Sequence, residues 1–145
     1  MPTNEKRILI VDDDDSIRGL LCTILSRRGF TVDTARNGIE ALARLRSCNY
    51  AAMLLDLMMP MKSGYDVLDE LKKSEAAQRP IVFVLTAGGA IRDLDPEVVA
   101  GSIRKPFDVE VLTDMVTACV TACAPRPQPP DCPPAESAEA RVKPS

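Results

Sequence analysis

The chain of 145 residues is long enough for one soluble domain with a modest core, since 27% of its residues are charged and 46% are hydrophobic. Its formal net charge is −3 and no basic stretch is clustered, so the composition gives no support to nucleic-acid binding. The N-terminus lacks an apolar signal segment, and no apolar run approaches the roughly 18 residues that a membrane span needs. We therefore expect a cytoplasmic protein with neither a nucleic-acid nor a membrane partner.

Five short runs of aliphatic and β-branched residues have the composition of buried strands. They are separated by segments whose apolar residues recur at helical spacing. In chain order, the predicted strands cover residues 7–11, 31–35, 51–56, 80–86 and 102–104. This alternation is typical of a doubly wound parallel sheet, whose right-handed crossovers place the carboxyl end of every strand at one edge.

Helical stripes cover residues 17–25, 39–45, 67–71 and 109–120. Asp14 or Asp15 is suited to cap the first of these helices, and Asp108 to cap the last. A further helix of only one or two turns is predicted at Asp95-Pro96-Glu97, where a capping acid precedes a proline. The fold class is therefore α/β, a five-stranded parallel sheet with helices on both faces and a short fourth helix.

The C-terminal residues 125–145 differ in composition from the rest of the chain, because seven of these 21 residues are proline and none is aromatic. Such a segment buries too little apolar surface to offset the entropy lost on ordering. We therefore expect an N-terminal extension over residues 1–5, one domain over residues 6–124, and a proline-rich disordered tail over residues 125–145.

The five cysteines form no recognisable metal or disulfide pattern. Cys119 and Cys123 lie four residues apart on the last predicted helix, and Cys132 lies in the predicted tail. A zinc site built from these three is a weak alternative, because the chain has no histidine and no Cys-x-x-Cys pair. We expect all five cysteines to be reduced thiols in a reducing compartment.

Acidic residues stand at the carboxyl ends of two predicted strands. Asp12 and Asp13 begin a run of four aspartates after the first strand, and Asp56 ends the third. Strand ends of this kind meet at the ligand-binding edge of an open parallel sheet. Helix capping explains Asp14 or Asp15 but not the whole set, and clustered carboxylates repel one another unless a cation is present. Because Mg²⁺ prefers oxygen ligands, the sequence predicts a magnesium site here.

Two further polar residues, Thr86 and Lys105, end the fourth and fifth predicted strands. Taken singly, each is as well explained by a threonine of the core or a solvated lysine. Together, a hydroxyl and an ammonium beside a metal are suited to hold the oxygens of a phosphoryl group. The predicted edge is thus a place for a divalent metal and a phosphoryl group.

Four segments of the chain, in this order and at these spacings, resemble the receiver domain of bacterial two-component response regulators. The matching segments are residues 8–14, residues 55–61 with Gly64, residues 85–87 and residues 105–107. The resemblance implies a flavodoxin-like fold. It also implies that Asp56 accepts a phosphoryl group from a phosphohistidine of a histidine kinase or phosphotransfer protein.

The same resemblance implies a role for each of the other polar residues. Asp12, Asp13 and the backbone carbonyl of Met58 would hold Mg²⁺ together with the acceptor carboxylate. Thr86 and Lys105 would contact the phosphoryl group after its transfer.

Two features of the chain depart from the family pattern. Ser102 stands three residues before Lys105, where the family usually carries tyrosine or phenylalanine. The span of 19 residues from Thr86 to Lys105 is also shorter than usual. Both changes fall on the usual output face, so we expect an atypical surface for partners.

We therefore expect a stand-alone, phosphorylation-dependent signalling switch that acts through an unidentified downstream protein and is not itself an enzyme. One alternative is a Mg²⁺-dependent phosphatase of the haloacid-dehalogenase type, in which Asp12 and Asp14 form the Asp-x-Asp pattern. That alternative leaves Asp56 unexplained. The other is a receiver-like interaction module that is never phosphorylated, which Ser102 mildly favours.

Overall fold

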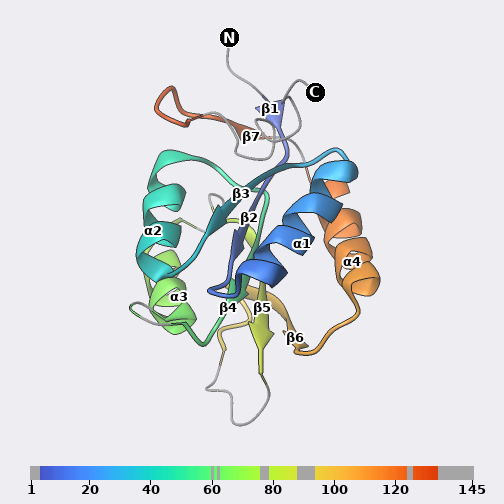
Figure 1. Cartoon of the computed structure of the whole chain (residues 1–145). Helices are drawn as coiled ribbons and strands as arrows, with labels where there is room; N and C mark the ends of the chain where they lie inside the picture. The colour runs from blue at the N-terminus through green and yellow to red at the C-terminus, as the bar shows by residue number, and fades with distance from the viewer. Residues whose placement is uncertain are drawn as a thin grey trace.

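The structure is a computed structural model that describes residues 4–59, 61, 63–75, 79–87, 94–123 and 126–133. Within this part of the chain, five parallel strands form the central sheet in the spatial order β3-β2-β4-β5-β6. They are β2 (Arg7–Val11), β3 (Thr31–Ala35), β4 (Ala52–Asp56), β5 (Ile81–Thr86) and β6 (Val99–Arg104). Their carboxyl ends lie together at the lower edge of the sheet in Figure 1. The predicted five-stranded parallel sheet is confirmed.

Four helices in the described residues cover both faces of this sheet (Figure 1). They are α1 (Asp15–Arg27), α2 (Gly38–Ser47), α3 (Gly64–Lys72) and α4 (Val109–Thr121). Helices α1 and α4 pack on one face, and α2 and α3 pack on the other. Among the residues described, no helix combines the length and apolar character that crossing a bilayer requires.

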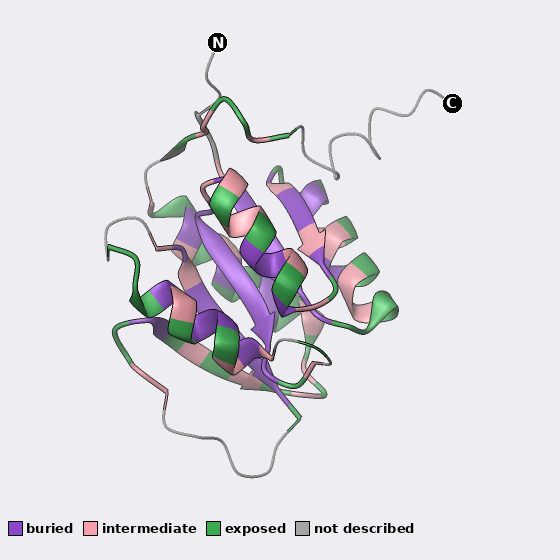
Figure 2. Ribbon diagram, turned by 90° about the vertical axis from the view of Figure 1, so that its left-hand side faces the viewer, coloured by how far each residue is buried: buried purple, intermediate pink, exposed green. Residues whose placement is uncertain are grey.

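Alternate side chains of each central strand enter two separate apolar cores. The core beneath α2 and α3 includes Leu9, Val11, Met53 and Leu55, and the core beneath α1 and α4 includes Ile8, Ile10, Leu54 and Leu85. Figure 2 shows the central strands as buried along their length. Because each buried aliphatic side chain contributes about 1.5–3 kcal/mol, the two cores fix the positions of the strand ends.

Side-chain caps set the starts of the helices. The Asp14 carboxylate accepts hydrogen bonds from the first-turn amides of α1, and Asp108 does the same for α4. Both predicted caps are confirmed. Ser63 and Asp66 form a reciprocal capping box at the start of α3, which fixes where that helix leaves the loop after β4.

The connection between β5 and β6 differs from the prediction in its described part. Residues 88–93 lie outside the described residues, and residues 96–98 form a single turn. The backbone amide of Val99 donates to the Asp95 carbonyl over 2.9 Å, and the Asp95 side chain accepts from the Glu97 amide. Strand β6 then begins at Val99, earlier than the predicted residue 102, because Val98 and Val99 are buried against the sheet. The predicted short helix is therefore only a turn in these residues.

The C-terminal strap, defined here as residues 126–133, lies over the amino ends of the parallel strands (Figure 1). Its strand β7 (Arg126–Pro127) pairs antiparallel with β1 (Asn4–Glu5). The Asn49 amide donates to the Gln128 side-chain oxygen over 2.8 Å, and the Gln128 side chain donates back to the Asn49 carbonyl over 2.7 Å. These residues therefore have a fixed place, which differs from the predicted disordered tail. The rest of that tail, residues 134–145, lies outside the described residues.

A disulfide bond between Cys48 and Cys132 fastens the strap to the loop that precedes β4. The prediction of five reduced thiols is therefore wrong for this pair, whereas Cys22, Cys119 and Cys123 form no disulfide within the part of the chain that the structure describes. The prediction failed because it rested on the absence of a paired cysteine motif and on the expected disorder around Cys132. Backbone pairing and side-chain hydrogen bonds hold the strap in place, and Cys132 packs against the core beneath α2 and α3.

Candidate metal and phosphoryl site

Three carboxylates meet at the carboxyl edge of the sheet. Asp12 and Asp13 follow β2, and Asp56 ends the adjacent strand β4. Each offers a carboxylate oxygen, and these three atoms lie within 4.8 Å of one another. The register of β2 and β4 pairs Val11 with Leu55, so the residues that follow are brought side by side. Asp12 and Asp56 are buried and Asp13 is exposed, which leaves the cluster open on one side.

Lys105 reaches this cluster from the loop after β6. Its ammonium nitrogen lies 2.9 Å from one oxygen of Asp12 and 3.3 Å from one oxygen of Asp56. Its backbone amide donates to the Thr86 carbonyl over 2.6 Å, which anchors the loop to the end of β5. Burial lowers the pKa of Lys105, but hydrogen bonds and charge from the two carboxylates outweigh it and raise that pKa above its usual value. The ammonium is therefore charged at neutral pH.

The environment of Asp56 disfavours its charged form. Burial, the largest influence, and repulsion from Asp12 raise the pKa of Asp56 to about 6. The hydrogen bond from the Met58 amide, over 3.0 Å, and the ammonium of Lys105 act in the opposite direction. A second cation beside Asp56 would stabilise its carboxylate further. The carboxylates of this site are therefore incompletely neutralised by Lys105, and the site favours a further cation.

The remaining predicted site residues lie at the same edge. Thr86 is buried at the last position of β5, and the Met58 backbone adjoins the Asp56 carboxylate through the hydrogen bond just described. The amide of Leu57 donates to the Leu85 carbonyl over 3.1 Å, so β4 and β5 stay joined beyond Asp56. Ser102, in contrast, is an exposed residue of β6.

Gly64 allows the start of α3 to lie in close contact with the end of β4. A Cβ atom at this position would lie 2.5 Å from the Asp56 carbonyl oxygen and 2.7 Å from the Leu57 Cα atom. Real Cβ atoms do not approach backbone this closely, so only glycine fits without movement. The placement of Asp56 therefore depends on a glycine eight positions further along the chain.

Arg18 is a residue of this region that the sequence patterns did not single out. It lies on α1, donates from Nη1 to the Asp12 carbonyl over 2.8 Å, and also pairs with the Asp15 carboxylate. The only sequence signal is its spacing of three residues from Asp15, which is common on helix surfaces. Arg18 thereby holds the backbone of the acidic loop from outside the cluster.

The donor set fits a hard divalent cation. Three carboxylates within reach of one ion, with one exposed, leave room for the water ligands that Mg²⁺ retains. The donors are all oxygen, which disfavours the soft metals that prefer thiolate. Lys105 supplies a fixed positive charge that contacts both Asp12 and Asp56, so it is suited to neutralise an anionic group bound to the Asp56 carboxylate.

Comparison with known proteins agrees with this geometry. Residues 8–117 match the family model described as the response regulator receiver domain. The chain is 42% identical over 108 residues to the transcriptional regulatory protein ResD of Bacillus subtilis, an alignment that covers 72% of this chain and 44% of that protein. It is 37% identical over 120 residues to the CpxR homolog of Haemophilus influenzae, covering 81% of this chain and 52% of that protein. The chain therefore spans about half the length of these curated relatives.

Solved structures of response regulators also resemble this chain. The structure of the response regulator TrrA from Thermotoga maritima in complex with Mg²⁺–BeF superposes with a TM-score of 0.68 at 38% identity. That superposition covers 79% of this chain and 98% of the other. A CheY-like receiver domain protein from Methanospirillum hungatei has a TM-score of 0.71 at 24% identity, covers 81% of this chain and 94% of that one, and supports the fold alone.

These matches favour the signalling switch over the phosphatase alternative, because the matched proteins are response regulators. The chain belongs to the receiver domain family of two-component response regulators.

Proposed function

We propose that this chain is a magnesium-dependent phosphorylation switch in which Asp56 accepts a phosphoryl group from the phosphohistidine of a histidine kinase or phosphotransfer protein. One observation carries the proposal above the others. The carboxylates of Asp12, Asp13 and Asp56 lie within reach of one ion, and the Lys105 ammonium contacts both Asp12 and Asp56. In this proposal, Mg²⁺ is held by those carboxylates and by the Met58 carbonyl.

The chemistry is an in-line phosphoryl transfer. A carboxylate oxygen of Asp56 forms a bond to phosphorus as the bond from phosphorus to the donor's histidine nitrogen breaks, and the imidazole keeps that electron pair. The product is an acyl phosphate on Asp56, which water later hydrolyses to carboxylate and phosphate. Bound Mg²⁺ would neutralise charge on the phosphoryl oxygens.

Two residues of the chain act on the transferred group in this proposal. The Lys105 ammonium, already 3.3 Å from Asp56, neutralises charge on a phosphoryl oxygen. Thr86, buried at the end of β5, donates its hydroxyl to another oxygen. The Lys105 amide is hydrogen-bonded to the Thr86 carbonyl. A movement of the loop that carries Lys105 therefore also displaces the end of β5 at Thr86, and the reverse holds as well.

The surroundings of the site support a protein as the phosphoryl donor. The chain has no histidine of its own. An apolar groove of about 360 Å³ runs between α1 and the loop that carries Lys105, and it is lined mainly by Ile17, Leu20, Phe107 and Val109. Leu20 is 48% exposed. An apolar surface beside the acceptor suits a protein partner better than a small phosphoester.

The output in this proposal is phosphorylation-dependent binding to a downstream protein, and the chain is not an enzyme that turns over a separate substrate. The names of two relatives describe transcriptional regulators about twice as long as the aligned region. For the described residues, we propose protein partners and no contact with nucleic acid. We also propose a cytoplasmic location, where kinases of this type present their phosphohistidine.

Phosphotransfer from a panel of purified, radiolabelled histidine kinases tests this function, with Asp56→Asn as the matched isosteric control. We expect label to move to the wild-type chain from at least one kinase, only with Mg²⁺ present, and never to the variant. If the wild-type chain instead hydrolyses small phosphoesters with turnover, the phosphatase alternative replaces this proposal.

A further inference from the structure

The disulfide between Cys48 and Cys132 joins the receiver domain to a segment that lies outside it. Cys48 directly follows α2 and belongs to the apolar core beneath α2 and α3, whereas Cys132 lies on the C-terminal strap. The match to the receiver family model ends at residue 117, before the strap begins. The superposition on TrrA likewise covers 98% of that structure but only 79% of this chain. The strap is therefore an addition to a complete receiver fold.

Hydrogen bonds are the main contacts that hold the strap besides the disulfide. Its pairing with β1 extends over only two residues of each strand, and so short a ladder is marginal by itself. The Asn49 side chain donates to the Pro127 carbonyl over 2.8 Å, next to the two bonds between Asn49 and Gln128. Each such bond adds little net free energy, because water replaces the partner when the bond breaks.

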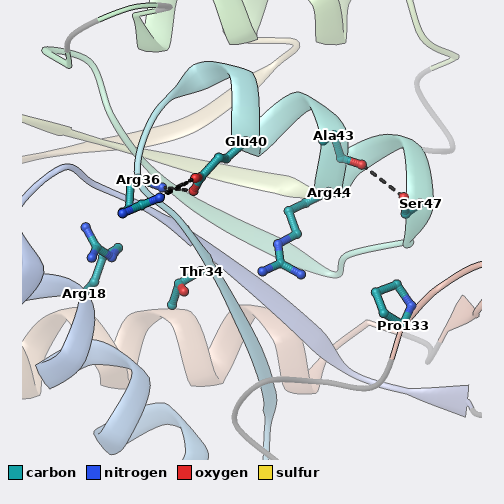
Figure 3. Close-up of a pocket in the computed structure, with 8 residues that line it drawn as sticks. All are labelled: Arg18, Thr34, Arg36, Glu40, Ala43, Arg44, Ser47 and Pro133. Atoms are coloured by element: carbon teal, nitrogen blue, oxygen red, sulfur yellow. Dashed lines mark hydrogen bonds and ion pairs between the residues drawn. The ribbon is translucent and has the colours of Figure 1, made fainter.

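On the side of β3 and α2, the strap borders open space. Pro133 is exposed and lines a cavity of about 530 Å³, which is also lined by Thr34 of β3 and by Arg44 and Ser47 of α2 (Figure 3). A segment with a cavity on one side lacks the dispersion contacts that close packing supplies there. The covalent bond from Cys132 to Cys48 is therefore the strongest single constraint on the strap.

We propose that the bond between Cys48 and Cys132 is a redox-controlled latch, which a dithiol reductant opens to release the strap from the folded domain. The two cysteines differ in accessibility, since Cys48 is 2% exposed and Cys132 is half-buried. A thiolate must reach a sulfur atom in order to attack a disulfide. Cys132 is therefore the position of attack, and the sulfur of Cys48 is the leaving group.

The opening reaction is a two-step thiol–disulfide exchange. A thiolate of the reductant forms a bond to the Cys132 sulfur as the bond between Cys132 and Cys48 breaks, and the Cys48 sulfur keeps the electron pair and takes up a proton. The second thiolate of the reductant then attacks the reductant's own sulfur in the mixed disulfide, so that Cys132 leaves and is protonated. The disulfide of the chain is thus reduced to two thiols, and the dithiol is oxidised to a disulfide.

Release of the strap opens the amino edge of the sheet but leaves the domain folded. The Arg7 Nη2 donates to the Pro133 carbonyl over 2.7 Å, and its Nε donates to the buried Asp33 carboxylate over 2.8 Å. The same carboxylate accepts a hydrogen bond of 2.6 Å from the Tyr50 hydroxyl. When the strap leaves, water takes the place of the Pro133 carbonyl, whereas the bonds to Asp33 lie within the domain and remain.

The latch and the acid cluster lie at opposite edges of the sheet. The whole length of β2 separates Arg7 from Asp12, roughly 16 Å at the usual rise of a strand. We therefore expect redox state and phosphorylation to act as separate inputs. The cytoplasmic location, which is taken from the proposed function, supports such a latch, because disulfides in most cytoplasmic proteins are transient or redox-sensing.

Amide hydrogen exchange of the full chain, followed by NMR before and after reduction with dithiothreitol, tests the proposal. The backbone amide of Asn49 is the reporter, because it donates to the Gln128 side chain of the docked strap. We expect its exchange to accelerate at least about tenfold on reduction, because protection by the strap is lost. The Leu57 amide, which is bonded to the Leu85 carbonyl at the other edge of the sheet, should exchange at the same rate in both states.

Two cysteine variants serve as matched tests. Cys132→Ser should exchange at Asn49 as the reduced wild type does, with or without dithiothreitol. Cys123→Ser should respond to dithiothreitol as the wild type does, since Cys123 forms no disulfide in the described residues. Equally slow exchange at Asn49 in the oxidised and reduced wild type would overturn the proposal. A disulfide that dithiothreitol reduces only after urea has unfolded the domain would also overturn it, because that behaviour belongs to a static structural bond.

Glutathione tests the direction of attack. As a monothiol it stops at the mixed disulfide until a second molecule reacts, so acid quenching and mass spectrometry should find the adduct on Cys132. An adduct on Cys48 would overturn the assigned direction.

Phosphorylation by acetyl phosphate separates the latch from the proposed function. The rate should be the same for the oxidised and the reduced chain, and a difference would overturn the independence of the two inputs. Accelerated exchange at Asn49 in a chain that acetyl phosphate never modifies would support the latch and count only against the proposed function.

Discussion

The ammonium nitrogen of Lys105 lies 3.3 Å from a carboxylate oxygen of Asp56, although 49 positions separate the two residues in the chain. The contact exists because β4 and β6 end at the same edge of the sheet, on either side of β5. It places a fixed positive charge beside a buried carboxylate that is otherwise repelled by Asp12. The chemistry proposed for the site depends on this arrangement.

Replacing Lys105 with glutamine should slow phosphorylation of the chain far more than it disturbs the fold. Removal of one preorganised charge from a transition state of this kind costs roughly 100-fold in rate. The rate of phosphorylation by acetyl phosphate, followed on Phos-tag gels with Mg²⁺ present, measures the effect. The control Lys73→Gln removes an exposed lysine at the end of α3. Equal rates for the two variants would show that Lys105 does not act on the phosphoryl group.

Magnesium should raise the thermal stability of the chain, because only the folded state assembles the acid cluster. A ligand at about 100 times its Kd stabilises the folded state by about 2.7 kcal/mol. Each kcal/mol raises the melting temperature of a domain of this size by about 2–4 °C. Asp13→Asn should lose most of this shift, whereas Asp69→Asn, an exposed acid on α3, should keep it. A melting curve that Mg²⁺ leaves unchanged in the wild type would contradict the predicted metal site.

Gly64→Ala should destabilise the chain, because the new methyl group would meet the backbone of Asp56 and Leu57 at impossible distances. Overpacking of this kind costs about 1–3 kcal/mol in free energy of unfolding. Gly19→Ala is the matched control. It lies inside α1, and an added Cβ would meet no atom within 4 Å, so alanine should stabilise by about 0.5–1 kcal/mol. Urea unfolding measures the free energy of unfolding of both variants. Equal changes in the two variants would contradict the described packing of α3 against β4.

Cys132→Ser should lower the free energy of unfolding of the oxidised protein by about 2–4 kcal/mol, because the disulfide to Cys48 closes a long loop in the unfolded chain. Under reducing conditions, wild type and variant should unfold alike. Cys123→Ser serves as the control, since Cys123 is a free thiol. Alkylation of native, oxidised protein that labels all five cysteines would contradict the disulfide.

The sheet and the acid cluster were predictable because local patterns determine them. Continuous apolar runs identify buried parallel strands, and right-handed crossovers bring their carboxyl ends together. Asp12, Asp56 and Lys105 therefore had to lie near one another once the strands were placed. The start of β6 was harder to predict, because Val98 and Val99 follow a turn signal at Asp95-Pro96 that resembles the start of a helix.

The C-terminal strap could not be predicted from local patterns. The strap is held by contacts with residues far away in the chain, such as Gln128 with Asn49 and Cys132 with Cys48. Its proline content predicts disorder when only hydrophobic burial is considered.

Identification of the phosphorylated residue by mass spectrometry tests the switch at its chemical centre. The intact chain is incubated with acetyl phosphate and Mg²⁺, and the acyl phosphate is trapped by borohydride reduction before digestion. We expect one modified residue, Asp56, and no modification in Asp56→Asn or when EDTA replaces Mg²⁺. Modification at Asp12 or Asp13, or labelling that survives Asp56→Asn, would contradict the role of Asp56 as the phosphoryl acceptor.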